Sequence, residues 1–295
     1  YFKSRKYDEA IKYYEICYEK EPDNTDVLYN LGCTYLKLNN YTQAINYLAM
    51  VSKREENSSE ALNLLGIVAA KLNRLETAIM ALERATQICP TDLRIWNNLG
   101  KIYYKAKKYA KSAEAFEKAL SINKERYEIW FNIGVIYTKS GEYTKAVDCF
   151  RKSLEIETDS YESWVNIAYI SYITGQQANA IQIYRSAISI DPSKPEAWYN
   201  MGIAYYKTGD YFKAYDSFQR AIEHSNKLKH KKALNAVYPK LRYHPRSEKR
   251  AFSRIPELSL NIINSLKDKF DRVRLEYQRN FIEDHIDVPE EESES

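Results

Sequence analysis

Glycine and proline are scarce in this sequence, with eight of each among 295 residues. So few turn-forming residues favour long helices over a turn-rich β architecture. No apolar run approaches the ~18 residues that a membrane-spanning helix needs. Charge is nearly balanced as well, with 44 basic and 40 acidic residues and a net charge of +4. Net charge therefore predicts no particular class of partner.

Motifs of enzymes and metal sites are also missing. The four histidines all lie beyond residue 223 and lack the spacing of metal ligands. The sequence contains no Gly-rich phosphate loop, Walker motif or G-x-S-x-G elbow. We therefore expect no enzyme activity, no metal and no cofactor.

Four widely spaced cysteines form no CxxC pair, which predicts reduced thiols. They are Cys17, Cys33, Cys89 and Cys149. The expected location is accordingly inside the cell, in the cytoplasm, with the nucleus and a cilium as alternatives.

Most of the chain follows a period of 34 residues. The four tryptophans recur at this spacing, and leucines continue the row upstream at Leu28 and Leu62. A small residue follows four places later in every unit. These tryptophans and small residues are Trp96, Trp130, Trp164, Trp198, Gly32, Gly66, Gly100, Gly134, Ala168 and Gly202. A fixed period of this length predicts stacked repeats, each of which covers the apolar face of its neighbour.

The second half of each unit has the pattern Tyr-x2-Ala-x3-Phe-x2-Ala, as at Tyr211, Ala214, Phe218 and Ala221. Prolines mark the end of the unit at Pro22, Pro90 and Pro192. Together with the Trp and Gly rows, these residues resemble the tetratricopeptide repeat (TPR) family. The resemblance implies an all-α, right-handed α-solenoid of helix-turn-helix repeats. Each repeat has a helix A and a helix B, and the A helices line a concave groove.

The register divides the chain into segments. Six repeats start at residues 25, 59, 93, 127, 161 and 195 and together span 25–228, and residues 1–24 are the end of a truncated repeat, mostly its helix B. Because Tyr1 stands at position 11 of that repeat, we expect the natural protein to extend upstream. A basic linker (229–254), a long amphipathic helix (255–284) and an acidic tail (285–295) follow.

Asparagine occupies position 6 of every repeat but the second, which has Leu64. The row consists of Asn30, Asn98, Asn132, Asn166 and Asn200. In the TPR family this position faces the groove, and the row is similar to the asparagine ladder of O-linked N-acetylglucosamine transferases. An amide both donates and accepts hydrogen bonds, which suits a peptide backbone running past it. Contact with a peptide and an ordinary polar surface are equally compatible with the row.

Other positions that the resemblance places in the groove carry basic or aromatic residues, with a second asparagine beside the row. They are Arg94, Asn97, Lys101, Tyr104, Phe131, Tyr169, Tyr172, Tyr199 and Tyr206. Exposed aromatics at this density would need a covering partner. The basic residues that chaperone-tail-binding repeats use are not reproduced, because only Arg94 and Lys101 are basic at the corresponding positions. An acidic chaperone tail is therefore not the expected ligand.

Charge is distributed unevenly after the repeats. Residues 227–254 carry ten Lys or Arg against one acid, whereas residues 283–295 carry seven acids and neither Lys nor Arg. The basic stretch fits an acidic partner, but a solvated linker is the favoured explanation; pairing with the acidic tail is another, and nucleic acid is not favoured. We expect a capping helix over 229–238 that ends before Pro239. The helix predicted at 255–284 would cap the repeats, dimerise or dock on a partner.

These patterns predict a non-enzymatic scaffold or adaptor that binds an extended protein segment in the groove. Two alternatives stay open at this point. The chain could be a structural subunit of a large intracellular assembly, ciliary or organellar for example. It could also be the targeting module of a multidomain enzyme such as a glycosyltransferase.

Overall fold

The chain is a succession of helices. The computed structural model describes residues 6–225 and 228–242, and this part of the chain contains no β-strand. Its helices are α1 (Tyr7–Lys20), α2 (Thr25–Lys37), α3 (Tyr41–Arg54), α4 (Ser59–Lys71), α5 (Leu75–Ile88), α6 (Leu93–Lys105), α7 (Tyr109–Ile122), α8 (Tyr127–Lys139), α9 (Tyr143–Ile156), α10 (Tyr161–Ile173), α11 (Gln177–Ile190), α12 (Pro195–Thr208), α13 (Tyr211–His224) and α14 (Leu228–Arg242).

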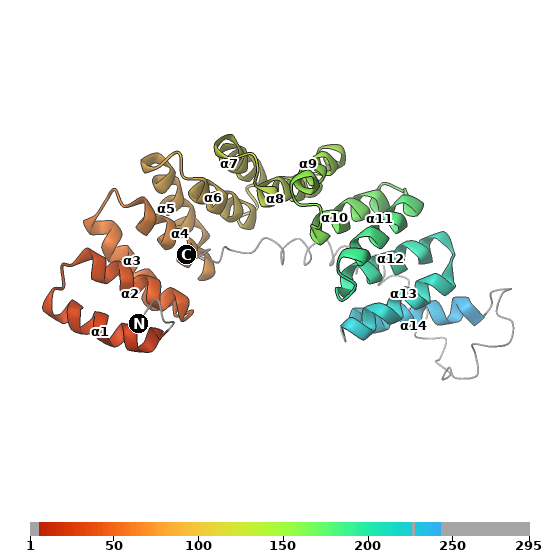
Figure 1. Cartoon of the computed structure of the whole chain (residues 1–295), viewed down its shortest axis with the longest axis horizontal. Helices are drawn as coiled ribbons and strands as arrows, with labels where there is room; N and C mark the ends of the chain where they lie inside the picture. Colours follow the sequence, from red (N-terminus) through yellow and green to blue (C-terminus); the bar gives the residue numbers. More distant parts are fainter. Residues whose placement is uncertain (1–5, 226–227, 243–295) are drawn as a thin grey trace. The chain divides into compact units, whose positions relative to one another are not determined.

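The helices come in pairs that follow one another in chain order (Figure 1). The first helix of each pair begins at a residue where a sequence repeat starts, namely Thr25, Ser59, Leu93, Tyr127, Tyr161 and Pro195. The expected all-α solenoid of helix-turn-helix repeats is thus confirmed. The chain divides into two compact units, and the division falls within α8, between Asn132 and Ile133. Each unit is described by itself below.

Helices A and B of one repeat approach each other closely at the glycine that recurs every 34 residues. A Cβ on Gly100 would lie 2.8 Å from the ring of Phe116, and one on Gly202 would lie 2.6 Å from the ring of Phe218. These distances are shorter than any van der Waals contact, so the missing side chain is what lets the bulky ring of helix B cover helix A. The fifth repeat instead has Ala168, which is fully buried, as is Tyr184 of the same repeat.

A left-handed residue at position 15 of each repeat ends the turn after helix A. Three of these residues are glycines (Gly141, Gly175 and Gly209), and the others are Asn39, Asn73 and Lys107, with φ between 57° and 87°. Glycine and asparagine adopt this conformation at low cost, but lysine pays a steric penalty from its Cβ. In the third repeat the fold therefore imposes the turn conformation on Lys107, although lysine does not favour it.

The repeated tryptophan ties each repeat to the turn before it. The indole Nε1 of Trp96 donates a hydrogen bond to the carbonyl oxygen of Pro90 at 2.8 Å. Trp130, Trp164 and Trp198 donate in the same way to the carbonyl six residues earlier, at 3.0, 3.1 and 2.9 Å. All four side chains are half-buried. The row is thus structural, both through ring packing and through this N–H group.

Helix α14 packs against α13 in the second unit. His230, Ala233 and Val237 are buried, and the ring of Tyr199 lies 5.0 Å from that of His230. The helix runs to Arg242, past Pro239, so the expected end before this proline is wrong. Burial of one face of α14 offsets the hydrogen bond that a proline inside a helix cannot donate.

Several expectations lie outside the described residues. They concern residues 1–5, the basic stretch 243–254, the helix at 255–284 with its dimerisation, and the acidic tail 285–295. All four cysteines lie within the described part, and all are free thiols, as their spacing predicts.

Candidate functional site

Within each unit, helices A of neighbouring repeats contact one another. In the first unit α2 contacts α4 and α4 contacts α6, and in the second unit α10 contacts α12. We call the surface that these helices present the A-helix surface. Its residues stand at positions 2, 5, 6, 9, 12 and 13 of the repeats.

The side chains of the asparagine row are more buried than those of residues on a freely exposed surface. Asn98, Asn132, Asn166 and Asn200 are only 2–6% exposed, and Asn30 of the first full repeat is half-buried. For Asn98, Asn166 and Asn200, the contact between successive A helices accounts for this burial. The sequence indicated the row but not its depth.

Hydrogen bonds within the chain hold two of these amides in place. The Nδ2 of Asn98 donates to the Oδ1 of Asn63, on the preceding helix A, at 2.9 Å. The Nδ2 of Asn166 donates to the backbone oxygen of Glu162 at 2.8 Å, one turn earlier in its own helix. Each bond uses one N–H of the amide, and neither amide oxygen is hydrogen-bonded within the described part of the chain. Asn63 is a site residue that sequence reasoning missed, because it stands at position 5, outside the asparagine row at position 6, and most repeats carry Tyr, Phe or Val there.

The aromatic residues of the A-helix surface are less exposed than expected. Tyr104, Phe131, Tyr169 and Tyr199 are buried, and Tyr172 and Tyr206 are half-buried. A covering partner is therefore not needed to keep the first four out of water. Their cover comes from the chain itself.

Neighbouring rings account for part of this cover. The ring of Tyr104 lies 5.5 Å from that of Tyr109, and the ring of Tyr206 lies 5.4 Å from that of Tyr211. Tyr199 packs between Phe218, 5.7 Å away, and His230 of α14. Burial raises the pKa of the Tyr199 hydroxyl to about 12. These contacts join helix A to the helices that follow it.

Basic residues of α6 have partners nearby. Arg94 forms an ion pair with Asp92 at 2.9 Å, and Asp92 also caps α6 by accepting from the backbone N–H of Arg94. Although burial raises the pKa of Asp92, the hydrogen bonds and the charge of Arg94 outweigh it, and the pKa is lowered overall. Lys101 is half-buried. Lys105 donates to the backbone oxygen of Ala70 at 2.9 Å and so links the ends of two A helices.

In the second unit, charge gathers where α12 begins. Lys194 forms an ion pair with Glu162 of α10 at 2.6 Å and lies over the ring of Tyr161, 4.5 Å from its centroid. The Tyr161 hydroxyl accepts a hydrogen bond from the backbone N–H of Ala197 at 3.0 Å. Burial raises the pKa of this hydroxyl well above its ordinary value. These groups again join neighbouring repeats.

The structure therefore groups the sequence-predicted residues by unit. Arg94, Asn97, Asn98, Lys101 and Tyr104 share α6 in the first unit. Asn30 lies on α2, and Phe131 and Asn132 lie on the part of α8 that belongs to the first unit. In the second unit, Asn166, Tyr169 and Tyr172 lie on α10, and Tyr199, Asn200 and Tyr206 lie on α12, which contacts α10.

The described residues contain no group of three or more His, Cys, Asp or Glu side chains placed to hold a metal ion. Among the helices of this part of the chain, none is long and apolar enough to cross a membrane.

Sequence profiles of one repeat family match most of the chain. Profiles described as "Tetratricopeptide repeat" match residues 1–67, 91–159 and 195–228, and one described as "TPR repeat" matches residues 66–107 and 168–209. Together they cover 1–159 and 168–228. The chain belongs to the tetratricopeptide repeat family. TPR proteins are generally non-catalytic interaction modules, and this membership supports a protein-binding scaffold.

Solved TPR structures share the fold. The C-terminal part of a TPR repeat-containing protein from Cytophaga hutchinsonii is 19% identical, with a TM-score of 0.65 over 79% of this chain and 96% of that one. MamA is 29% identical, with a TM-score of 0.52 over 53% of this chain and 91% of its own. YrrB, described as "a TPR protein with an unusual peptide-binding site", is 18% identical, with a TM-score of 0.52 over 65% and 97%. Among curated protein sequences, none matches this TPR chain significantly.

Proposed function

We propose that this TPR chain is a non-enzymatic scaffold whose A-helix surface binds an extended segment of a partner protein. Family membership supports a protein-binding role, and YrrB shows that a protein of the same fold has a peptide-binding site. The proposal applies to each unit separately, to α2, α4 and α6 in the first and to α10 and α12 in the second.

The observation that carries the proposal is the fixed orientation of two amides, Asn98 and Asn166. Each is held by a hydrogen bond within the chain and keeps a carbonyl oxygen that accepts no hydrogen bond from the described residues. The backbone of an extended peptide needs acceptors for its N–H groups. Amides that are already ordered lose little entropy on binding, so such contacts cost less than contacts from mobile side chains.

Half-buried neighbours would supply the side-chain contacts. Lys101 stands one turn after Asn97 on α6, and Tyr172 and Tyr206 occupy the same position of successive repeats on α10 and α12. Tyrosine buries a large area with little rotamer entropy, which makes it a frequent anchor at interfaces. A segment bound to the second unit would accordingly present apolar side chains to Tyr172 and Tyr206, and a segment bound to the first unit would present an acidic or polar side chain near Lys101.

A selection from a random peptide library on the full chain tests this proposal. The affinity of the selected peptides would be measured by fluorescence anisotropy for the parent, for Lys101→Glu and for the double variant Tyr172→Ala/Tyr206→Ala. We expect at least one of these variants to weaken binding tenfold or more. The matched control is Lys111→Glu on helix B of the third repeat, where the side chain is exposed. Peptides that bind both A-helix variants normally but are lost with Lys111→Glu would overturn the proposal.

A further inference from the structure

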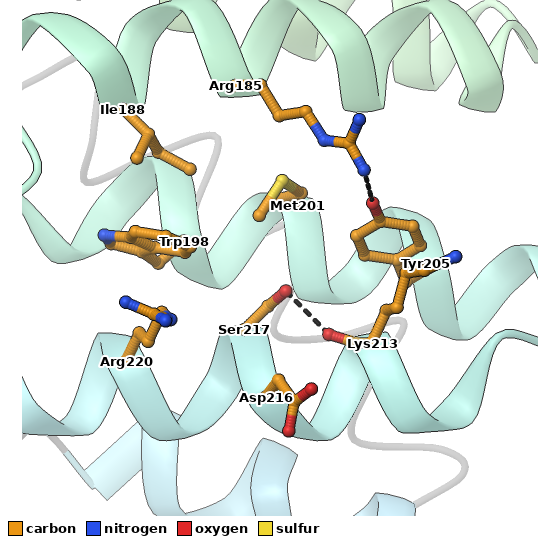
Figure 2. Close-up of a pocket in the computed structure, with 9 residues that line it drawn as sticks. All are labelled: Arg185, Ile188, Trp198, Met201, Tyr205, Lys213, Asp216, Ser217 and Arg220. Atoms are coloured by element: carbon orange, nitrogen blue, oxygen red, sulfur yellow. Dashed lines mark hydrogen bonds between the residues drawn. The ribbon is translucent and has the colours of Figure 1, made fainter.

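A pocket of about 250 Å³ lies between α11, α12 and α13, all of which belong to the second unit (Figure 2). Its apolar lining is mostly buried and consists of Ile188, Trp198, Met201 and Tyr205. The volume falls below the range of about 300–1,000 Å³ that is typical of pockets for small molecules. The pocket therefore suits one side chain of a peptide better than a cofactor.

Two hydrogen-bond donors stand together at one end of the pocket. The Nη2 of Arg185 donates to the hydroxyl oxygen of Tyr205 at 2.7 Å. Because this hydroxyl accepts a hydrogen bond, its own hydrogen can be donated to a ligand. The guanidinium of Arg185 is exposed and has several further N–H groups. An N–H and an O–H placed side by side suit the two oxygens of a carboxylate.

In two earlier repeats the tyrosine that corresponds to Tyr205 is used differently. The hydroxyl of Tyr35 donates to Glu15 at 2.9 Å, and the hydroxyl of Tyr103 donates to Glu83. Both glutamates stand at position 25 of the preceding repeat, where the pocket has its arginine. The earlier hydroxyl hydrogens are thus bound within the chain, whereas the arginine leaves that of Tyr205 available to a ligand.

An arginine at position 25 does not make such a site by itself. Arg151 stands at this position one repeat earlier, but position 11 of the repeat that follows it is Ser171 rather than tyrosine. Arg151 also lies 4.0 Å from the carboxylate of Asp148. Among the repeats of this sequence, the combination of arginine at position 25 and tyrosine at position 11 occurs only at the pocket. Arg151 therefore provides a matched control.

The other end of the pocket has an aromatic ring beside a cation. The guanidinium of Arg220 lies 4.9 Å from the ring centroid of Trp198. Figure 2 shows this pair on the opposite side of Met201 from Tyr205. Tryptophan, tyrosine and arginine are the residues that most often dominate binding energy at protein interfaces. The pocket thus has the composition of a protein-binding site, with an apolar end and a donor end.

The remaining charged residues leave the donor end cationic. Lys213 forms an ion pair with Asp210 at 2.6 Å, so its charge is already neutralised. Asp216 also lines the pocket, and Figure 2 shows it at the edge away from Arg185. A negatively charged group is therefore favoured beside Arg185 and disfavoured beside Asp216.

We propose that this pocket binds a segment of a partner protein in which an acidic residue follows leucine or an apolar residue of similar size. The apolar side chain enters the part lined by Ile188, Trp198 and Met201. The carboxylate accepts hydrogen bonds from Arg185 and from the hydroxyl of Tyr205. The helix A residues of the pocket stand at positions 4, 7 and 11, none of which belongs to the A-helix surface. This second binding site is therefore independent of the proposed function.

Methyl NMR of the methionines in the full chain tests the proposal. The chain has three methionines, of which Met201 lines the pocket, while Met50 and Met80 lie in the first unit and serve as internal controls. The probe is the peptide acetyl-Gly-Leu-Asp-Gly-amide, and two matched peptides replace its Asp by Asn or its Leu by Ala. A peptide of this size should bind with a Kd on the order of 1 mM. We expect the probe to shift only the Met201 signal, and either replacement to weaken binding about fivefold or more.

A variant of the pocket arginine provides the second arm of the experiment. Arg185→Glu gives the pocket the acid that Tyr35 and Tyr103 contact in earlier repeats, so the fold should tolerate it. It should weaken the Leu-Asp peptide about tenfold or more, because it removes a cationic donor and adds a repelling charge. The control Arg151→Glu should leave the affinity unchanged. If circular dichroism shows that Arg185→Glu loses helix, Arg185→Gln is used instead, with a loss of about fivefold expected.

Three results would overturn the proposal. They are a Met201 signal that the probe does not shift, equal affinity for the Asp and Asn peptides, and an affinity that the change at Arg185 leaves unaltered. A peptide that bound the A-helix surface instead would keep its affinity in the Arg185 variant. The proposed function would therefore stand even if the pocket bound no peptide.

Discussion

The side-chain amide of Asn98 donates a hydrogen bond to that of Asn63 at 2.9 Å, across two successive A helices. The pair couples the second repeat to the third through two polar groups rather than through apolar packing. It also fixes the Asn98 amide on the surface that we propose as the partner site. We therefore propose two roles for Asn98, one in stability and one in binding.

Replacing Asn98 by Ala should lower the free energy of unfolding by about 1 kcal/mol, because the hydrogen bond to Asn63 is lost. The control is Asn30→Ala, at the same position of the first full repeat, where the side chain is only half-buried. It should change the free energy by less than about 0.5 kcal/mol. Chemical denaturation of both variants checks the difference. Equal effects would show that the Asn63 contact contributes nothing.

Replacing Lys107 by Gly should stabilise the protein. Lys107 has a φ of 59°, a conformation that costs a residue with a Cβ about 1 kcal/mol and costs glycine much less. The reciprocal change, Gly141→Ala at a φ of 78° in the fourth repeat, should destabilise by a similar amount. Thermal unfolding measures both variants. A shift of the melting temperature in the same direction for both would contradict the predicted cost of a left-handed residue with a Cβ.

The Nε1–H group of Trp96 should contribute about 0.5–1.5 kcal/mol through its hydrogen bond to Pro90. Substitution by 3-benzothienylalanine keeps the fused ring and removes only the N–H donor. Urea denaturation of this variant should show the loss, and Trp96→Phe should cost more because it also removes apolar contact area. If the benzothienyl variant is as stable as the parent, the hydrogen bond contributes nothing and the tryptophan stabilises the fold through ring packing alone.

Alkaline pH should destabilise the protein partly through Tyr199. Burial raises the pKa of this hydroxyl from 10.0 to about 12, so the folded state favours the protonated form. Its contribution to stability is present below pH 10 and is lost as the pH rises from 10 towards 12, by about 2–3 kcal/mol in all.

The variant Tyr199→Phe removes this titration, and its stability should decline less steeply above pH 10. Tyr13→Phe is the control for the loss of a tyrosine hydroxyl, since Tyr13 is 53% exposed on α1. Urea denaturation between pH 8 and pH 11 measures the slopes. A profile for Tyr199→Phe that follows the parent would show that ionisation of this tyrosine does not limit stability.

The repeat architecture could be predicted from sequence because it depends on residues that recur at a fixed spacing. Trp96 and Gly100 each have counterparts in other repeats, and the A helices begin at the residues where the repeats start. Proline at the end of the unit also marked the end of helix B, since α5 ends at Ile88, two residues before Pro90. The residues that recur every 34 positions are the ones that pack the repeats together, so the sequence period predicts the stacking.

Other features depend on contacts that one sequence does not show. The burial of Asn98 follows from how closely α4 and α6 approach, and its partner Asn63 stands outside the asparagine row. Helix α14 continues past Pro239 because tertiary burial outweighs a local preference. The pocket lined by Arg185, Trp198 and Lys213 unites residues from α11, α12 and α13 that lie apart in the sequence (Figure 2).

Hydrogen exchange of the full chain, with and without a selected peptide, tests the central claim most directly. If the partner segment binds the A-helix surface, protection should increase in α6, or in α10 and α12, while α7 and α13 of the same repeats exchange as before. Protection confined to the B helices α7, α11 and α13 would contradict the account. It would place partner binding on the other side of the repeats.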